Sequence, residues 1–426
     1  QFLCFGVPPP MSSQALPSFD IDFVRQQFPA LQEPVLDGQA FFENAGGSYT
    51  CRQVIERLTR FYTQRKVQPY GPYDASRLGG EEMDDARDRL AAALDVESDE
   101  LSFGPSTTQN TYVLARAFAE HLSPGDAIVL TNQDHEANTG PWRRLTAAGI
   151  EVREWRLDPE SGLLDPAGLS ALLDDRVKLV CFPHCSNVVG APNDVPALCA
   201  IAHAAGAVTC VDGVSYAPHG LPNVAKLGAD IYLFSSYKTF GPHQGIMVVR
   251  RALADALPSQ AHYFNASYRT KKFTPAGPDH AQIAACAGMV DYLETLHDHH
   301  FPAAAGTASL TAKAEAVHDL SRDYENTLLQ PLLDFLGTRN SIRLIGPRTA
   351  ADKAPTVAVH SQRSGEDLAT ALAPRGIMAG GGDFYGVRCL EGLGIDPDHG
   401  VLRLSFVHYT RREDIDHLID ALEAEI

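Results

Sequence analysis

Short apolar runs alternate with Ala-rich amphipathic stretches from about Leu36 to Val249. The apolar runs predict buried strands, and the stretches between them predict helices. One such helix is expected from Pro196 to Ala205, with Gly206 ending it. This alternation is typical of parallel β-α units in an α/β fold. The clearest strands are Ala127–Leu130, Val177–Phe182, Ala207–Asp212 and Ile231–Phe234.

Polar residues follow several of these strands. Asp212 closes one strand, Ser235 comes directly after another, and Asn187 lies just past a third. Parallel strands place their carboxyl ends along one edge of a sheet, where α/β proteins bind ligands. We therefore expect these side chains to meet at one site.

The second half of the chain has a different pattern. Long helices are predicted from Gln282 to His297 and from Thr311 to Phe335, and they would carry the chain out of the large domain. A small α+β domain should follow. Its predicted parts are a strand at Thr356–Val359, a helix near Glu366–Ala373, the Gly-rich stretch Gly380–Gly382, a strand at Val401–Phe406 and a closing helix from Arg412.

These patterns predict three parts of the chain. Residues 1–30 form an N-terminal extension and arm, residues 31–290 a large domain, and residues 291–426 a small domain. Met11 resembles a natural start, so the first ten residues are interpreted as an upstream extension.

The composition of the chain limits the binding partners and the cellular compartment that we expect. The chain has 53 acidic and 35 basic side chains, a formal net charge of −18. Such a charge repels phosphates and anionic surfaces, so neither nucleic acid nor membrane is an expected partner. Its eight cysteines are scattered, which favours a reduced, cytoplasmic protein. Cys181 and Cys185 lack the second pair of ligands that a zinc site needs, so no metal is expected.

Two residues indicate a cofactor. Asp212 ends an apolar strand, where an unpaired carboxylate is costly, and Lys238 follows another such strand in Ser235-Ser236-Tyr237-Lys238. Pyridoxal 5′-phosphate (PLP) needs an amine to hold it, an acid to keep its pyridine nitrogen protonated and a polar cup for its phosphate. Taken alone, Asp212 fits a helix cap or turn, and Lys238 fits an exposed loop.

The combination of Asp212-Gly213 with Ser-x-x-Lys and Gly-Pro resembles the class V aminotransferases. This group of fold-type I PLP enzymes contains the cysteine desulfurases. The resemblance covers about Phe41 to Glu425, and it implies a large domain with a mostly parallel seven-stranded sheet between helices plus a small C-terminal α+β domain. The further segments that carry it are Phe42–Gly47, Phe103–Asn110, Asp134–Asn138, Ser186–Gly190 and Arg403–Thr410.

The resemblance implies a role for each matching residue. Lys238 would carry PLP as a Schiff base and later act as the general base at the substrate's Cα. Asp212 would hold the ring nitrogen, and Arg403 would bind the substrate carboxylate. The remaining implied residues are His135 stacked on the ring, Asn187 at the ring hydroxyl, Thr107 and Thr108 at the phosphate, Ser235, Tyr237 and Ser215 around the cofactor, and Asn44 near the substrate. Each of them also has an ordinary structural explanation when considered alone.

The chain departs from the family pattern at several positions. Tyr237 stands where desulfurases commonly have His, and Ser215 where they often have Gln. Pro278 lies near the position by which a partner subunit reaches the phosphate in the homodimer that the resemblance implies. The loop Ala379–Gly386 contains no cysteine, although a desulfurase needs a mobile thiolate there. Cys389 follows, but a buried helix cysteine is the commoner case.

The sequence thus predicts a PLP-dependent enzyme that acts on an amino acid. C–S bond cleavage, by desulfuration or β-elimination, ranks first, and the alternatives within the family are transamination and epimerisation. A catalytically inactive PLP-fold binding protein is the alternative from another class. A nicotinamide-dependent dehydrogenase is disfavoured, because no Gly-x-Gly-x-x-Gly follows an early strand.

Overall fold

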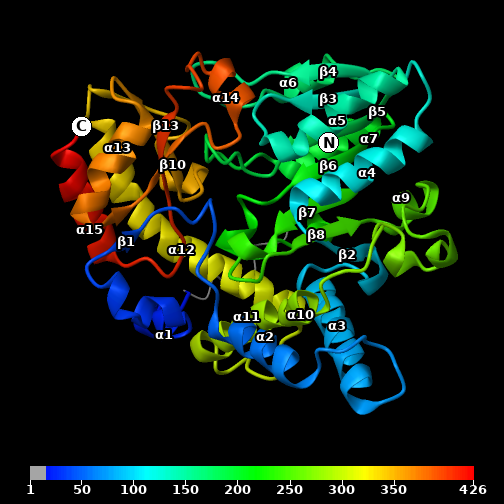
Figure 1. Ribbon diagram of the computed structural model, residues 1–426. Helices are drawn as coiled ribbons and strands as arrows, with labels where there is room; N and C mark the ends of the chain where they lie inside the picture. Colours follow the sequence, from blue (N-terminus) through cyan, green and yellow to red (C-terminus); the bar gives the residue numbers. More distant parts are fainter. Residues whose placement is uncertain (1–15) are drawn as a thin grey trace, which may run out of the picture.

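The computed structural model describes residues 16–426, so the predicted extension at residues 1–10 lies outside the described residues. Two sheets of different size organise the chain, a seven-stranded sheet and a four-stranded one (Figure 1). Within residues 16–426, no helix has the length and apolarity that crossing a membrane requires.

The large sheet has the strand order β2-β8-β7-β6-β5-β3-β4. The five strands from β7 to β4 are parallel, and β8 runs antiparallel to both of its neighbours. All four of the strands predicted most clearly are confirmed, as β3, β5, β6 and β7. The bounds are β2 Leu101–Gly104, β3 Ala127–Thr131, β4 Glu151–Trp155, β5 Val177–Pro183, β6 Val208–Asp212, β7 Ile231–Ser235 and β8 Gly245–Val249.

Helices cover both faces of this sheet, because the side chains of its strands alternate between two apolar cores. Ile128 and Leu130 of β3 face the core beneath α4 and α5, whereas Ala127 and Val129 face the opposite core. The predicted helix Pro196–Ala205 is confirmed as α7, and Gly206 follows it with a φ of 80°. The helices of this part are α2 Arg52–Gln64, α3 Asp74–Ala93, α4 Thr107–His121, α5 Gly140–Arg143, α6 Pro166–Ser170, α7 Val195–Ala204, α8 Val224–Leu227 and α9 Arg251–Ala256.

The helical connection between the domains differs in part from its prediction. One helix was expected over Gln282–His297, but the structure has α10 (His280–Ala285) and α11 (Ala287–His300), which meet at Cys286. The other predicted helix is α12 (Leu310–Gly337). Its first half packs Ala314 and Val317 into the large core, and its second half packs a row of leucines into the small one. A single helix thus ties the two cores together (Figure 1).

The small domain is built on an antiparallel sheet of order β12-β13-β10-β9. The predicted Gly-rich stretch forms its edge strand β12, in which Gly380 lies opposite Arg403. β1, which falls in the range predicted for the large domain, pairs with β11 beside this sheet. The remaining bounds are α1 Ile21–Gln26, β1 Ala40–Phe41, β9 Ile342–Leu344, β10 Thr356–Ser361, α13 Gly365–Leu372, β11 Ile377–Met378, β12 Gly380–Gly382, α14 Val387–Gly392, β13 Val401–Ser405 and α15 Arg412–Glu423.

Candidate active site

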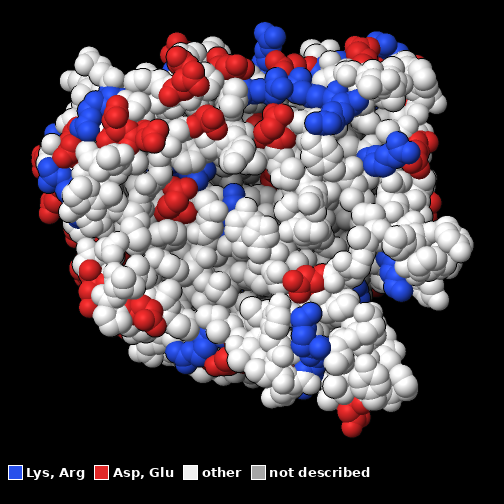
Figure 2. Space-filling view, viewed as in Figure 1, with Lys and Arg blue, Asp and Glu red and all other residues white. Residues whose placement is uncertain are grey.

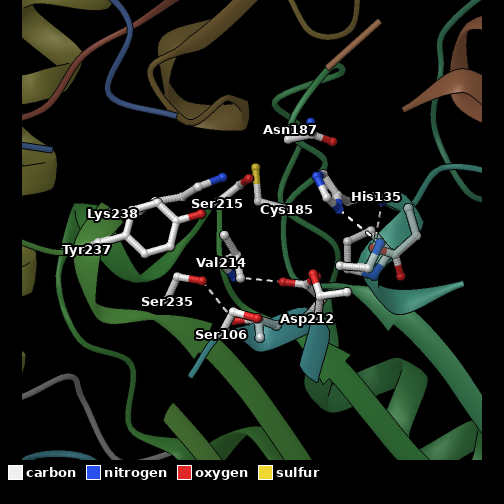
Figure 3. Close-up of a pocket in the computed structure, with 15 residues that line it drawn as sticks. Ser106, His135, Cys185, Asn187, Asp212, Val214, Ser215, Ser235, Tyr237 and Lys238 are labelled. Carbon is white, nitrogen blue, oxygen red and sulfur yellow. Dashed lines mark hydrogen bonds between the residues drawn. The ribbon is translucent and has the colours of Figure 1, made fainter. Parts of the chain in front are cut away.

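The carboxyl ends of the parallel strands form the floor of a pocket (Figure 3). The surface is hollowed near the middle of the face shown in Figure 2, with acidic and basic atoms around the hollow. Nine residues that the sequence nominated for the cofactor line this one pocket, which confirms that they lie together. They are Thr107, Thr108, His135, Asn187, Asp212, Ser215, Ser235, Tyr237 and Lys238.

Lys238 and Asp212 are groups of opposite charge on neighbouring strand ends, and Asp212 is buried whereas Lys238 is half-buried. Burial and the charge of Arg403 together lower the pKa of Lys238 to about 8, against the opposing effect of Asp212 and Glu43. Burial raises the pKa of Asp212 to about 6, although the Val214 N–H donates to its Oδ1 at 2.8 Å. The Lys238 amine is therefore partly neutral near pH 8. The negative charge of the Asp212 carboxylate is only partly compensated by its surroundings.

A second buried carboxylate lies beside this pair. Burial and the negative charge of Asp212 raise the pKa of Asp134 well above its ordinary value, and Asn138 Nδ2 donates to Asp134 Oδ2 at 2.7 Å. The ring of His135 follows it. Its Nδ1 accepts from the Ala137 N–H at 3.0 Å, and burial lowers its pKa to about 3. His135 is therefore neutral and can pack its ring on a flat partner without adding charge.

One end of the pocket is a cup of hydroxyl and amide groups. Helix α4 starts here, and its N-cap Ser106 accepts from the Gln109 N–H at 3.2 Å. Thr107 Oγ1 lies 2.8 Å from Ser235 Oγ, which joins the helix start to the end of β7. The Tyr237 ring stacks on His243 with centroids 4.5 Å apart. A helix N-terminus with such hydroxyls is suited to a phosphate group.

The pocket continues outwards to Arg403 on β13, so both domains contribute to the site. The Arg403 side chain is 3% exposed. Its Nη2 donates to Glu43 Oε1 at 2.6 Å and its Nη1 to the Asn187 carbonyl at 3.4 Å. The Phe384 ring covers the guanidinium with its centroid 3.8 Å from Cζ. This chain thus holds Arg403 from several sides.

The loop after β12 forms the outer wall. Phe384 and Tyr385 are consecutive non-glycine residues in the left-handed region, with φ of 53° and 56°. Such backbone is costly unless the surroundings fix it. Asn187 Nδ2 donates to the Phe384 carbonyl at 2.9 Å, and the Glu136 N–H donates to the Tyr385 carbonyl at 2.8 Å. These bonds tie the loop to the large domain.

One nominated residue, Asn44, lies away from the pocket walls, and Cys389 is the buried helix cysteine that the sequence favoured. Asn44, nominated for the substrate, lines neither part of the pocket; its Oδ1 accepts from the Tyr409 hydroxyl at 2.6 Å and its Nδ2 donates to the Lys238 carbonyl at 3.4 Å. It supports the backbone of Lys238 instead. Cys389 is fully buried, and burial raises its pKa to about 12. Its thiol is neither accessible nor ionised at neutral pH.

Sequence reasoning gave no role to Asp134, Glu43, Cys185 or the Phe384-Tyr385 pair, all of which line the site. The sequence could have indicated Asp134. It follows the predicted strand Ala127–Leu130, in the same way that Asp212 lies at the end of another predicted strand. Glu43 and the Phe384-Tyr385 pair belong to quoted segments, but only the packing of the small domain brings them to Arg403. Cys185 is buried, and burial raises its pKa to about 12, so it adds apolar wall rather than a thiolate.

The parallel sheet, the strand-end lysine and aspartate and the small domain that closes over them define a class of protein. The sequence model of the family described as Aminotransferase class-V matches residues 40–418, and the chain belongs to this family. Among its relatives, the aminotransferase-like protein FGM3 of Gibberella zeae is 33% identical over 95% of this chain and 98% of its own length. A cysteine desulfurase of Serratia proteamaculans is 30% identical over the same shares of the two chains.

Solved structures agree with this fold. The apo structure of the cysteine desulfurase from Thermococcus onnurineus superimposes with a TM-score of 0.82 at 23% identity, covering 97% of this chain and 99% of the other. The cysteine desulfurase CsdA from Escherichia coli gives a TM-score of 0.79 at 23% identity, covering 95% and 98%. The fold-type I architecture predicted from the sequence is confirmed.

Proposed function

We propose that this protein binds PLP at Lys238 and cleaves the C–S bond of an amino acid by β-elimination. The observation that carries the proposal is the meeting of Lys238, Asp212 and His135 in one buried pocket that opens towards Arg403. Family membership supports the cofactor, and the desulfurases among the relatives support sulfur chemistry.

The residues present fit the cofactor. The α4 N-terminus, Thr107, Thr108 and Ser235 would hold its phosphate, and neutral His135 would cover its ring. Asp212 and Asp134 are two buried carboxyl groups with raised pKa values. A cationic ring nitrogen of the cofactor would compensate the negative charge of Asp212. Asn187 Oδ1, a buried atom that no donor in the described residues reaches, could accept from a hydroxyl on the ring. Bound PLP supplies an electron sink for the carbanion at the substrate's Cα.

The chain's own groups supply the proton transfers and the anchoring. Lys238 takes the Cα proton as general base, and its lowered pKa keeps a useful share of the amine neutral near pH 8. The Cβ–S bond then breaks with its electron pair on sulfur, and the leaving thiolate takes up the proton that Lys238 removed and departs as a thiol. Water converts the three-carbon remainder to pyruvate and ammonia. Arg403 anchors the α-carboxylate, and the Phe384-Tyr385 wall shields the reacting atoms from water.

The cysteines favour elimination over desulfuration. Transfer of sulfur to the enzyme needs an accessible thiolate over the substrate. All seven cysteines in the described residues are buried, Cys389 among them. β-Elimination needs no such thiol, because the sulfur departs on the leaving group.

Transamination is the second candidate, since the relative FGM3 is described as aminotransferase-like. Transamination uses the same lysine, aspartate and arginine. It differs in the atom that receives the proton removed from Cα. A binding protein without activity is disfavoured by the lowered pKa of Lys238, because a desolvated amine costs stability and a pocket that performs no reaction has no use for it.

The deciding experiment loads the chain with PLP and supplies cysteine, its sulfoxides and S-substituted cysteines. β-Elimination gives pyruvate and ammonia in equal amounts, with an equal amount of thiol from an S-substituted cysteine, sulfide from cysteine or sulfenic acid from a sulfoxide. Alanine with sulfide from cysteine would identify a desulfurase. In the presence of a keto-acid acceptor, a 3-mercaptopyruvate that keeps its C–S bond, formed without ammonia, would identify an aminotransferase. Lys238→Ala is the matched control and should lose both the lysine-bound absorption band of the cofactor and the products.

We also propose that the chain acts as a homodimer. Tyr263, Phe264 and Tyr268 are exposed by 90%, 63% and 56% on one short segment, an unusual density of free aromatic surface. The nearby Pro275–Pro278 stretch borders a pocket that reaches Ser106 at the cup. A second copy covering this segment would close that end of the site. Light scattering should give twice the chain mass, and Tyr263→Ser with Phe264→Ser should lower it.

A further inference from the structure

The Glu43–Arg403 pair places an acidic group inside the substrate pocket. Glu43 comes from the segment after β1 and Arg403 from β13, and the two segments are held together by backbone bonds. The Ser405 N–H donates to the Phe42 carbonyl at 2.7 Å, and the Asn44 N–H donates to the Ser405 carbonyl at 3.2 Å. The position of Glu43 is therefore fixed by the strand that carries Arg403.

Two glycines make the space for the Glu43 carboxylate. A Cβ atom at Gly46 would lie 2.7 Å from its Oε1, and a Cβ atom at Gly380 would lie 2.7 Å from its Oε2. Any other residue at either position would push the carboxylate aside. The position of the Glu43 carboxylate thus depends on residues from both the segment after β1 and the edge strand β12.

The pair is incomplete as an ion pair. Arginine and a carboxylate bind best through two parallel hydrogen bonds. Here one bond joins Arg403 Nη2 to Glu43 Oε1, while Glu43 Oε2 and Arg403 Nε are buried without a partner in the described residues. A ligand carboxylate that makes two bonds to Arg403 could therefore displace Glu43.

Displacement leaves Glu43 negative and facing the ligand. The other carboxylate of the outer pocket, Glu136, already has partners: Thr139 Oγ1 donates to it at 3.0 Å and Arg388 lies 3.5 Å away. Glu43 is only 28% exposed, so water compensates its charge in part. The group that best restores the balance is a cation on the ligand itself. The α-amine of the ligand is used to bind the cofactor, so the cationic group must be on the side chain of the ligand.

We infer that Glu43 determines specificity by releasing Arg403 to the substrate's α-carboxylate and then pairing with a cationic group on its side chain beyond sulfur. Aromatic groups on the same walls, Tyr112, Tyr237, Phe384 and Tyr385, suit a cation as well. This inference rests on the proposed function. It names the substrate class as S-substituted cysteines with a positively charged substituent.

The test compares three ligands that differ in side-chain charge. S-(2-aminoethyl)cysteine is cationic, S-methylcysteine is neutral and S-carboxymethylcysteine is anionic. Their dissociation constants are measured on the full PLP-loaded chain from the change in cofactor absorption, which reports binding rather than turnover. We expect the cationic ligand to bind at least about tenfold more tightly than the anionic one, because juxtaposed like charges are costly in a partly buried site.

Glu43→Gln separates specificity from structure. It should reduce the cation-to-anion ratio to within about threefold and, by freeing Arg403, tighten the binding of S-methylcysteine. Structural damage would instead weaken all three ligands, and thermal melting with Glu43→Ala as a second variant checks the fold. Glu136→Gln, an acidic group of the same pocket that already has partners, should change the ratio less.

The outcomes distinguish the two proposals. Equal affinities for the three ligands in the wild type, or an unchanged ratio in Glu43→Gln, would overturn the role of Glu43 and leave C–S cleavage standing. If none of the three ligands alters the absorption of the loaded chain, the proposed function itself fails.

Discussion

Replacing Lys353 by methionine should remove a pH dependence of folding stability that a buried amine creates. Lys353 is 0% exposed and lies between the two domains. Its Nζ donates to the Ile345 carbonyl at 2.8 Å and to the Val189 carbonyl at 2.6 Å. Val189 belongs to the turn that carries Asn187 into the active site. The amine thus clamps the small domain to a turn of the site.

The magnitude follows from the change in proton affinity on folding. Burial lowers the pKa of Lys353 from 10.5 to about 7. Between pH 7 and 10.5 the unfolded chain binds this proton and the folded chain does not, so stability rises with pH. Below pH 7 both states are protonated and the cost of the buried charge is complete. At about 1.4 kcal/mol per pKa unit, the cost is about 5 kcal/mol as an upper limit.

Urea unfolding of wild type and Lys353→Met at a series of pH values between 7 and 9 measures this effect. The stability of wild type relative to the variant should rise by up to about 1.4 kcal/mol per pH unit. Methionine also leaves two carbonyls unpaired, at about 1–3 kcal/mol each, but that loss does not vary with pH. Lys66→Met, at an exposed lysine, is the matched control and should show no such trend. Parallel stability curves for wild type and Lys353→Met would refute the reasoning.

Two further predictions concern the site. Cys389→Ala should keep turnover within about threefold of wild type while lowering stability by roughly 1–2 kcal/mol, because the thiol is a buried packing group; a loss of several orders of magnitude in kcat would restore Cys389 as a nucleophile. The rate at which the PLP-free chain captures PLP should rise with pH and level off near pH 8, because only the neutral amine of Lys238 attacks the aldehyde; stopped-flow absorbance that keeps rising towards pH 10 would show that burial does not lower this pKa.

Much of the fold could be predicted because the large domain consists of local patterns. The strands β3, β5, β6 and β7 are apolar on both faces, so each appears in the sequence as a continuous run. The break at Cys286 was missed because both α10 and α11 are apolar there, and helical periodicity continues across the junction. The pairing of β1 with β11 was missed because a two-residue strand carries no periodicity, and its partner lies far along the chain.

The inner site could be predicted for a related reason. Asp212, Asn187 and Lys238 follow neighbouring strands, and the geometry of a parallel sheet brings the ends of such strands together. The residues that the small domain contributes to the pocket wall could not be predicted in this way. Phe384 reaches Arg403 only because β12 pairs with β13 and Asn187 holds the loop, two contacts that depend on domain packing.

The charge balance of the outer pocket shows why composition could not give the substrate. A net charge of −18 says nothing about which carboxylate faces the ligand. Glu43 and Arg403 are 360 residues apart in the chain, and their contact requires the segment after β1, the edge strand β12 and two glycines to be in place. Lys353 likewise meets Val189 across 164 residues. Both contacts lie where the two domains meet, so the charge there depends on the packing of the domains rather than on the cofactor motif.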